Sequence, residues 1–149
     1  GTDPVAAAVF LPATRELFVA AKGHGAWLGS TPLRVSNCES LETALVATGF
    51  SYSSTRRDTQ GQRIARLLPQ VRDIRRFGAA AADLCFVASG RIDAYFEEGL
   101  QSWDLAAGQL IASEAGAIVS NFSGGTKSSK SGIPSGHLNF DRYKLNINK

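Results

Sequence analysis

Apolar and turn-forming stretches alternate along the first forty residues and predict short strands. Residues 5–11 and 16–20 are apolar runs separated by Pro-Ala-Thr-Arg, a pattern typical of a β-hairpin. A third strand around residues 26–28 and an extended piece at 31–36 follow between glycines, and a short helix is expected at about residues 39–42. The first part of the chain is therefore predicted to be rich in β-structure.

The second part of the chain alternates between strand and helix patterns. The predicted order is a strand at 44–50, a polar loop at 51–62, a helix with Ile64, Leu67, Leu68 and Val71 on its apolar face, an extended segment at 74–77, a helix at 79–89, a strand at 92–96, a helix at 103–115 and a strand at 117–120. The continuous apolar run at 44–50 suits a strand buried on both faces. The alternation implies an α/β arrangement with helices packed on a sheet.

Length and composition indicate one folded domain with an unusual end. The 149 residues are 44% apolar and 19% charged, as in ordinary globular proteins. Residues 1–120 hold 11 Lys and Arg against 12 Asp and Glu, whereas residues 121–149 hold 5 against 1. We interpret residues 121–149 as an atypical basic tail rich in Ser, Asn and Lys, in loop or disordered form, with a last strand at 143–147. A basic tail can attract polyanions, but this one lacks interleaved aromatic residues, so no nucleic-acid partner is expected.

Three further features bear on the compartment and on the extent of the chain. No run of about 18 apolar residues is present, so no membrane partner is expected. Cys38 and Cys85 lack the spacing of a zinc site, and Cys85 falls in an apolar helical pattern, which indicates a reduced buried thiol and a cytoplasmic location. The sequence contains no Met, and we therefore expect a fragment or a processed piece.

Two junctions lead from an extended segment into a helix and are candidates for a binding site. At the first, Gly78, Ala79 and Ala80 leave the backbone open to a ligand beside a helix N-terminus, which attracts anions. The alternative is that these residues are small because a helix and a sheet pack closely there. At the second, Asp104 can cap the helix or, if Ser102 caps it, can bind a divalent cation. The pattern alone leaves both alternatives open.

The other acidic residues divide into one candidate pair and two surface positions. Glu97 and Glu98 are neighbours on a predicted strand and point to opposite faces, so at most one of them shares a site with Asp104. Asp83 and Glu114 are expected to be acids on helix surfaces. No P-loop, GxSxG or HExxH motif is present.

Three stretches carry motifs that occur together in one known family. The longest is GAAAADLCFVASGRIDAYFEEGLQSWDLAAGQLIASEAGAIV, residues 78–119, with Trp-Asp at 103–104 and Glu-Ala-Gly at 114–116. ELFVAAKGHGAWLGSTPLRVS, residues 16–36, holds a hairpin followed by Gly-x-Gly-Ala, and LVATGF occupies residues 45–50. In kind and in order these motifs closely resemble those of the inositol monophosphatase family, whose members are magnesium-dependent phosphomonoesterases.

The resemblance implies a fold and also exposes a departure from the family. The implied fold is the layered α-β-α-β sugar-phosphatase fold, with residues 1–120 as the C-terminal part of its domain (hairpin plus β-α-β-α-β) and residues 121–149 as an atypical tail. The acidic motif of the family's first half, Glu followed by Asp-Pro-x-Asp-Gly-Thr, is absent, and GTDP at residues 1–4 resembles it only superficially. Because metal catalysis of this kind needs ions held between several carboxylates, we expect little or no activity from the isolated chain.

The resemblance also implies roles for individual residues. Asp104 corresponds to a magnesium ligand that faces the substrate, and Glu97 to the acid that contacts substrate hydroxyls. Gly78, Ala79 and Ala80 correspond to a junction that lies against the substrate. Ala79 stands where members commonly have Ser or Thr, which removes a hydroxyl from that position.

Two functional hypotheses follow from these observations. The first is Mg²⁺-dependent hydrolysis of a small-molecule phosphate monoester, such as an inositol phosphate, with a histidinol-phosphate-phosphatase-like activity as an alternative substrate class. The second is a non-catalytic remnant that acts as a folded binding or oligomerisation module. In that case an exposed apolar sheet surface should drive self-association, with a homodimer as the expected form.

Overall fold

The computed structural model describes residues 4–120 and 137–138, which contain two β-sheets and three α-helices. The elements are β1 (Ala6–Leu11), β2 (Glu16–Ala21), β3 (Ala26–Leu28), β4 (Thr31–Pro32), the 3₁₀ turn η1 (Leu41–Thr43), β5 (Leu45–Thr48), α1 (Ser54–Leu67), the 3₁₀ turn η2 (Leu68–Gln70), β6 (Asp73–Arg75), α2 (Ala80–Ala88), β7 (Ala94–Phe96), α3 (Ser102–Glu114), β8 (Val119–Ser120) and β9 (His137–Leu138).

The first sheet, called sheet A here, is antiparallel and has the order β1-β2-β3-β4. The predicted hairpin is confirmed, with Leu11 opposite Glu16 and the turn at residues 12–15. Alternating side chains give the sheet two faces. One face packs Phe18 and Ala20 into the core, while Phe10 and Leu17, paired across the other face, remain 56% and 46% exposed.

The second sheet, called sheet B here, has the order β6-β5-β7-β9-β8. Strand β5 lies in the middle of a parallel set, with β6 on one side and β7 on the other. Val46, Ala47 and Thr48 are all buried, which confirms the prediction of a strand covered on both faces. The carboxyl ends of β5, β6 and β7 consequently meet at one edge of sheet B, and the loops that follow these strands share that edge.

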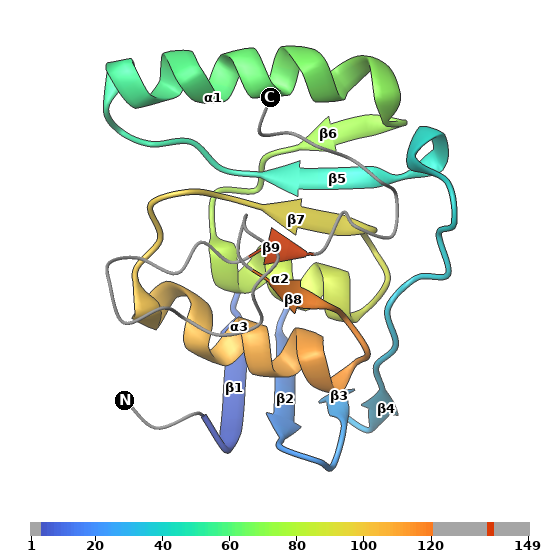
Figure 1. Ribbon diagram of the computed structural model, residues 1–149. Helices are drawn as coiled ribbons and strands as arrows, with labels where there is room; N and C mark the ends of the chain where they lie inside the picture. Colours follow the sequence, from blue (N-terminus) through green and yellow to red (C-terminus); the bar gives the residue numbers. More distant parts are fainter. Residues whose placement is uncertain (1–3, 121–136, 139–149) are drawn as a thin grey trace.

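Helices α2 and α3 lie between the two sheets and pack closely on each other (Figure 1). Helix α3 contacts β1, β2 and β3 of sheet A, and α2 contacts both β1 and β7. Gly108 permits the close approach of the helices, because a Cβ at this position would lie 2.8 Å from the Cβ of Leu84. With α1 beyond sheet B, the order of layers agrees with the α-β-α-β fold that the family resemblance implied.

Helix α1 begins earlier than the sequence pattern predicted. The polar stretch at residues 51–62 was expected to be a loop, but the helix starts at Ser54. Its first turns are polar because they face solvent, and Gln60 is the buried exception, accepting a hydrogen bond from the backbone N–H of Ser51 at 2.9 Å. Leu68, assigned to the apolar face, is 51% exposed. Periodicity missed the first turns of this helix because its contact with the core is narrow.

Strand β9 corrects a second prediction. The segment from residue 121 to residue 142 was expected to be loop or disorder, yet His137–Leu138 form a two-residue strand. Such a strand is too short to show a periodic pattern, and its pairing with β7 and β8 defines it. The predicted strand at 143–147 and the basic side chains of the tail lie outside the described residues. Among the described helices, none is long and apolar enough to cross a membrane.

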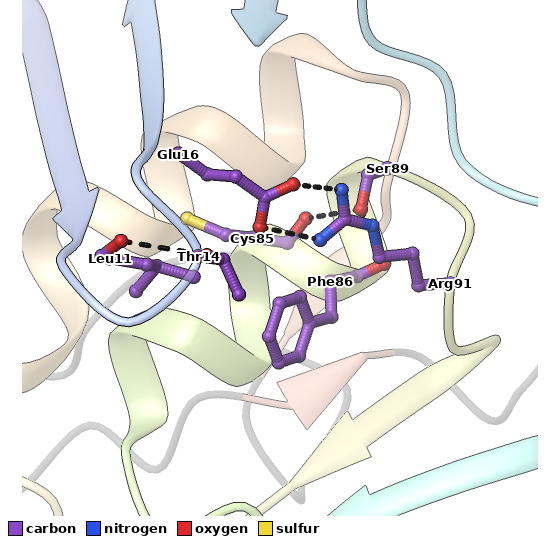
Figure 2. A network of polar contacts seen from close by, with 7 residues as sticks. All are labelled: Leu11, Thr14, Glu16, Cys85, Phe86, Ser89 and Arg91. Carbon is purple, nitrogen blue, oxygen red and sulfur yellow. Dashed lines mark hydrogen bonds and ion pairs between the residues drawn. The ribbon is translucent and has the colours of Figure 1, made fainter.

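A polar network joins the β1–β2 hairpin to the end of α2 (Figure 2). Arg91 donates from both terminal nitrogens to the carboxylate of Glu16, with 2.9 Å between Nη1 and Oε2. Its guanidinium also lies 5.8 Å from the ring centre of Phe18 and 5.6 Å from that of Phe86. Cys85 in the same region is a buried free thiol, as predicted. The network ties sheet A to the helical layer.

Candidate functional site

The candidate residues from the sequence gather at the carboxyl edge of the parallel strands. Glu97 and Glu98 directly follow β7, Gly49 follows β5, and the junction at residues 76–79 follows β6. Helices α2 and α3 begin at this edge, at Ala80 and Ser102. In open α/β sheets, ligands bind outside the carboxyl ends of the strands, so the topology alone makes this edge the first place to look for a site.

A hollow lies at this edge between the ends of β5 and β7 and the helix α1. It encloses about 230 Å³ of empty space, including the part that is open to solvent. Its lining residues are Thr48, Gly49, Phe50, Gln60, Arg63, Ile64, Phe96, Glu97 and Glu98. Apolar walls with a few converging polar groups are typical of small-molecule sites.

Glu97 is held in one place by its neighbours. Its Oε2 accepts a hydrogen bond from the hydroxyl of Tyr95 at 2.7 Å, and the two residues share a face of β7 because they are two positions apart. Burial raises the pKa of Glu97, while the bond from Tyr95 and the charge of Arg76 act in the opposite direction. The negative charge of Asp104 adds to the rise, which places Glu97 and Asp104 in one electrostatic environment.

Glu98 lines the same hollow as Glu97 but has a different partner. Its carboxylate pairs with Arg63 of α1. The two acids that follow β7 therefore have separate partners, and the charge of Asp104 acts on the pKa of Glu97.

Asp83 is buried rather than on a helix surface, which corrects the prediction. Its side chain is 1% exposed, and neither carboxylate oxygen has a hydrogen-bond partner among the described residues. Burial and the charge of Glu97 together raise its pKa to about 7, against the opposing effects of the Ala79 backbone and Arg76. A buried, uncompensated carboxyl next to Glu97 is the kind of perturbed group that occurs at functional sites.

Asp104 caps its own helix in this structure. The N-cap residue of α3 is Gln101, and the carboxylate Oδ2 of Asp104 accepts a hydrogen bond from the Gln101 backbone N–H at 2.9 Å. Ser102, the alternative cap predicted from the sequence, is the first residue of the helix instead. Asp104 is partly exposed, so the capping bond occupies one oxygen of a carboxylate that solvent can reach.

The sequence left two interpretations of the junction before α2 open, a backbone accessible to a ligand or close packing of a helix on a sheet. Each interpretation fits different residues of the junction. Gly78 has a φ of +89°, a conformation that favours glycine, and both Gly78 and Ala79 are exposed. Ala79 is the N-cap residue of α2. Ala80 is 8% exposed and belongs to the hydrophobic core. Close packing therefore accounts for the small size of Ala80, while the backbone at Gly78 and Ala79 stays open.

Glu114 lies at the surface of α3, as predicted, and its carboxylate is engaged in hydrogen bonds. Its two carboxylate oxygens accept hydrogen bonds from the backbone N–H groups of Gly23 and Gly25, each at 2.9 Å. These bonds hold the pKa of Glu114 below its usual value. The Gly-x-Gly turn after β2 and the Glu-Ala-Gly end of α3 are thus in direct contact, although 89 or more residues separate them in the sequence.

The described residues do not complete a metal centre by themselves. No group of three or more His, Cys, Asp or Glu side chains within the described part of the chain is arranged to hold a metal ion. Asp104 offers one hard oxygen donor, whereas a magnesium site needs several oxygen ligands. A magnesium ion bound here would need ligands from beyond these residues.

Three residues around Glu97 were not predicted from the sequence as parts of the site. For two of them, the sequence contains a pattern that could have indicated this role. Asp83 is the one charged residue between Ala79 and Ala88, in a helix with no polar face to receive it. Tyr95 stands two positions before Glu97 on a strand, which places their side chains together. Arg76 gave no such signal, since its role depends on where β6 ends.

Comparisons with known proteins agree with this geometry. A model of the inositol monophosphatase family matches residues 1–143. The inositol-1-monophosphatase SuhB of Mycobacterium tuberculosis is 51% identical over 123 residues, or 80% of this chain and 42% of the relative. The Nus factor SuhB of Vibrio cholerae is 45% identical over 127 residues, or 85% of this chain and 48% of the relative.

A solved structure gives the same result. The extragenic suppressor protein suhB of Bartonella henselae superposes with a TM-score of 0.87 at 36% identity, over 99% of this chain and 58% of that one. The chain thus spans about half the length of the proteins that it matches. On the family match, the sequence identity and the superposition, the chain belongs to the inositol monophosphatase family.

Proposed function

We propose that this chain supplies one part of a magnesium-dependent site that hydrolyses the phosphate monoester of a small polyol. The observation that carries the proposal is the meeting of Glu97 and Asp104 at the carboxyl edge of sheet B. They come from β7 and α3, yet the charge of Asp104 raises the pKa of Glu97. Membership of the inositol monophosphatase family supports the reaction class.

The proposed roles follow the positions of the side chains. Asp104 would be one ligand of the magnesium ion, through the carboxylate that solvent can reach. Glu97 would accept hydrogen bonds from substrate hydroxyls, and the open backbone at Gly78 and Ala79 would lie against the substrate, with Ala80 behind it. An inositol phosphate is the proposed substrate, and histidinol phosphate is the alternative within the same class of small phosphate monoesters.

Because the described residues do not complete a metal centre, we propose that the isolated chain hydrolyses little or no substrate. The test is phosphate release from inositol 1-phosphate by the 149-residue chain, with and without millimolar Mg²⁺, in a sample shown to be folded by circular dichroism. We expect no magnesium-dependent release. Turnover that depends on Mg²⁺ would contradict the expectation of inactivity and would support the reaction class.

The role of Asp104 has a separate test that does not need turnover. Asp104→Asn should weaken Mg²⁺ binding by the chain, measured by calorimetric titration. Asp58→Asn is the matched control, since Asp58 lies on the exposed face of α1, where its carboxylate accepts a hydrogen bond from Gln62. The assignment of Asp104 is wrong if its replacement leaves both Mg²⁺ affinity and any turnover unchanged.

The exposed face of sheet A favours a second candidate function, a folded module for self-association. Phe10, Leu17 and Trp27 are exposed on β1, β2 and β3, and an apolar surface of this kind is commonly covered by a partner. We propose a homodimer as the assembled form. Light scattering should then give twice the monomer mass, and Phe10→Ser should lower it. A monodisperse wild-type monomer would exclude this candidate.

We also propose a cytoplasmic location. Cys85 is a buried thiol that forms no disulfide bond, which is the usual state of cysteines in a reducing compartment. Fractionation of cells that produce the protein tests this proposal.

A further inference from the structure

The hydrogen bond between Tyr95 and Glu97 is sheltered from water. Tyr95 is 0% exposed, and its hydroxyl lies 2.7 Å from Oε2 of Glu97. Burial, the bond to Glu97 and the nearby charge of Asp83 all raise the pKa of Tyr95 well above its usual range. The phenol therefore stays protonated and donates its hydrogen to the carboxylate. Hydrogen bonds to a charged acceptor are stronger than neutral ones.

Gly49 supplies the space that the carboxylate of Glu97 occupies. A Cβ built on Gly49 would overlap Oε1, Oε2 and Cδ of Glu97, all at less than the 3.0 Å below which real Cβ atoms are essentially never found. Gly49 directly follows β5, the neighbour of β7, so the carboxylate lies across the backbone of the adjacent strand. Any other residue at position 49 would push Glu97 out of this place.

We propose that Tyr95 and Gly49 are positioning residues that hold Glu97 in a single orientation for the substrate. The hydroxyl of Tyr95 bonds Oε2, and Gly49 opens the space in which the carboxylate lies. The remaining acceptor capacity of the carboxylate is then presented at the rim of the hollow, where a polyol hydroxyl can donate to it. This inference rests on the proposed function, because it needs Glu97 to contact the substrate.

Side-chain positions fixed before binding lower the cost of ordering them when the ligand arrives. A Glu side chain that is free to rotate would lose rotamer freedom on contact with a hydroxyl. Tyr95 is a buried residue of β7, so its side chain is ordered when the chain folds, before any ligand arrives. The arrangement thus transfers the ordering cost from the binding step to the folding step.

The first test compares two tyrosines in the full 149-residue chain. Tyr95→Phe removes the sheltered hydroxyl, and Tyr52→Phe removes the same atom from a side chain that is 97% exposed. The readout is the pKa of the Glu97 carboxyl, followed by ¹³C NMR. Because the bond from Tyr95 lowers this pKa, its loss should raise the pKa of Glu97 in Tyr95→Phe, while Tyr52→Phe leaves it unchanged.

The second test compares two glycines. Gly49→Ala should displace Glu97, whereas Gly61→Ala on α1 meets nothing within 4 Å and serves as the matched control. The readout is the dissociation constant for inositol 1-phosphate, measured by calorimetry on chains shown to be folded. We expect an increase of about tenfold for Gly49→Ala and for Tyr95→Phe, and none for the two controls.

The outcomes separate the inference from the proposed function. If the wild-type chain binds inositol 1-phosphate and both test variants bind it equally well, the inference is wrong and the proposed function stands. If the wild-type chain does not bind it, the substrate role of Glu97 in this chain fails, and the pKa comparison alone decides whether Tyr95 positions Glu97. An unchanged pKa of Glu97 in Tyr95→Phe would overturn the inference independently of any ligand.

Discussion

Helix α2 carries polar side chains near both of its ends, and the two groups differ in how their charges are balanced. Near its C-terminal end, Arg91 binds both carboxylate oxygens of Glu16 (Figure 2). The guanidinium of Arg91 also lies beside the rings of Phe18 and Phe86. The bonds from Arg91 lower the pKa of Glu16 to about 2. Near its N-terminal end, Asp83 is buried without a partner among the described residues, and its pKa rises to about 7.

This difference in charge balance indicates a structural role for the Glu16–Arg91 pair and a functional role for the region around Asp83. The Glu16 network joins the hairpin of sheet A to the helical layer, and its charges are compensated. The Asp83 region faces the candidate site, where Glu97 and Asp104 add negative charge that Arg76 only partly offsets. Uncompensated charge costs folding free energy and is retained where binding or catalysis needs it. Three variants test this comparison.

The largest expected effect on the free energy of unfolding comes from replacing Asp83, the buried acid without a partner among the described residues. The folded-state pKa of Asp83 is raised from 3.8 to about 7, so the folded chain binds a proton that the unfolded chain has already lost. Stability from this group is present below pH 4 and is lost as the pH rises to 7. Asp83→Asn should therefore raise the free energy of unfolding by about 2–4 kcal/mol at pH 8 and change it little at pH 4.

Urea unfolding at the two pH values measures the effect of Asp83→Asn, with Asp58→Asn as the control for loss of an exposed charge. If the variant also binds inositol 1-phosphate less well, stability and function are opposed at Asp83. If Asp83→Asn changes the free energy of unfolding by the same amount at pH 4 and pH 8, ionisation of Asp83 does not destabilise the folded chain, and the prediction is wrong.

A smaller effect on the free energy of unfolding, with the opposite dependence on pH, is expected from replacing Glu16, the acid paired with Arg91. The pKa of Glu16 is lowered from 4.5 to about 2, so its contribution to stability is present above pH 4.5 and is lost as the pH falls towards 2. The side chain of Arg91 is 41% exposed, which screens the pair. Glu16→Gln should lower the free energy of unfolding by about 1 kcal/mol at pH 7, and by nothing at pH 2.

Thermal unfolding across this pH range checks the Glu16 prediction, and exposed Glu42→Gln is the control. A loss of stability at pH 2 as large as that at pH 7 would mean that the charge of Glu16 contributes nothing.

The smallest effect concerns geometry rather than charge. Arg91→Lys keeps the positive charge but loses the planar group that donates twice to Glu16 and lies by Phe18 and Phe86. We expect a loss of about 0.5 kcal/mol, measured by urea unfolding at pH 7, with exposed Arg66→Lys unchanged. A loss as large as that of Glu16→Gln would show that geometry accounts for most of the pair's contribution.

The sequence by itself determined the strands of sheet A, the alternating elements from β5 to β8 and the positions at which α2 and α3 begin. Patterns of this kind are local: the apolar run at 6–11 and the glycine before α2 act over a few residues. Motif resemblance added the family, and it named Asp104 and Glu97 as candidates before the structure showed that the charge of Asp104 acts on the pKa of Glu97.

Tertiary structure alone decided which acids are free, which are buried and which are bonded. Asp83 and Glu114 both looked like surface acids, but one is enclosed between a helix and a sheet and the other bonds a turn 89 or more residues away. The start of α1, the strand β9 and the space at Gly49 depend on neighbours in the same way. Burial and hydrogen-bond partners are properties of packing between distant segments, and periodicity along one segment does not contain them.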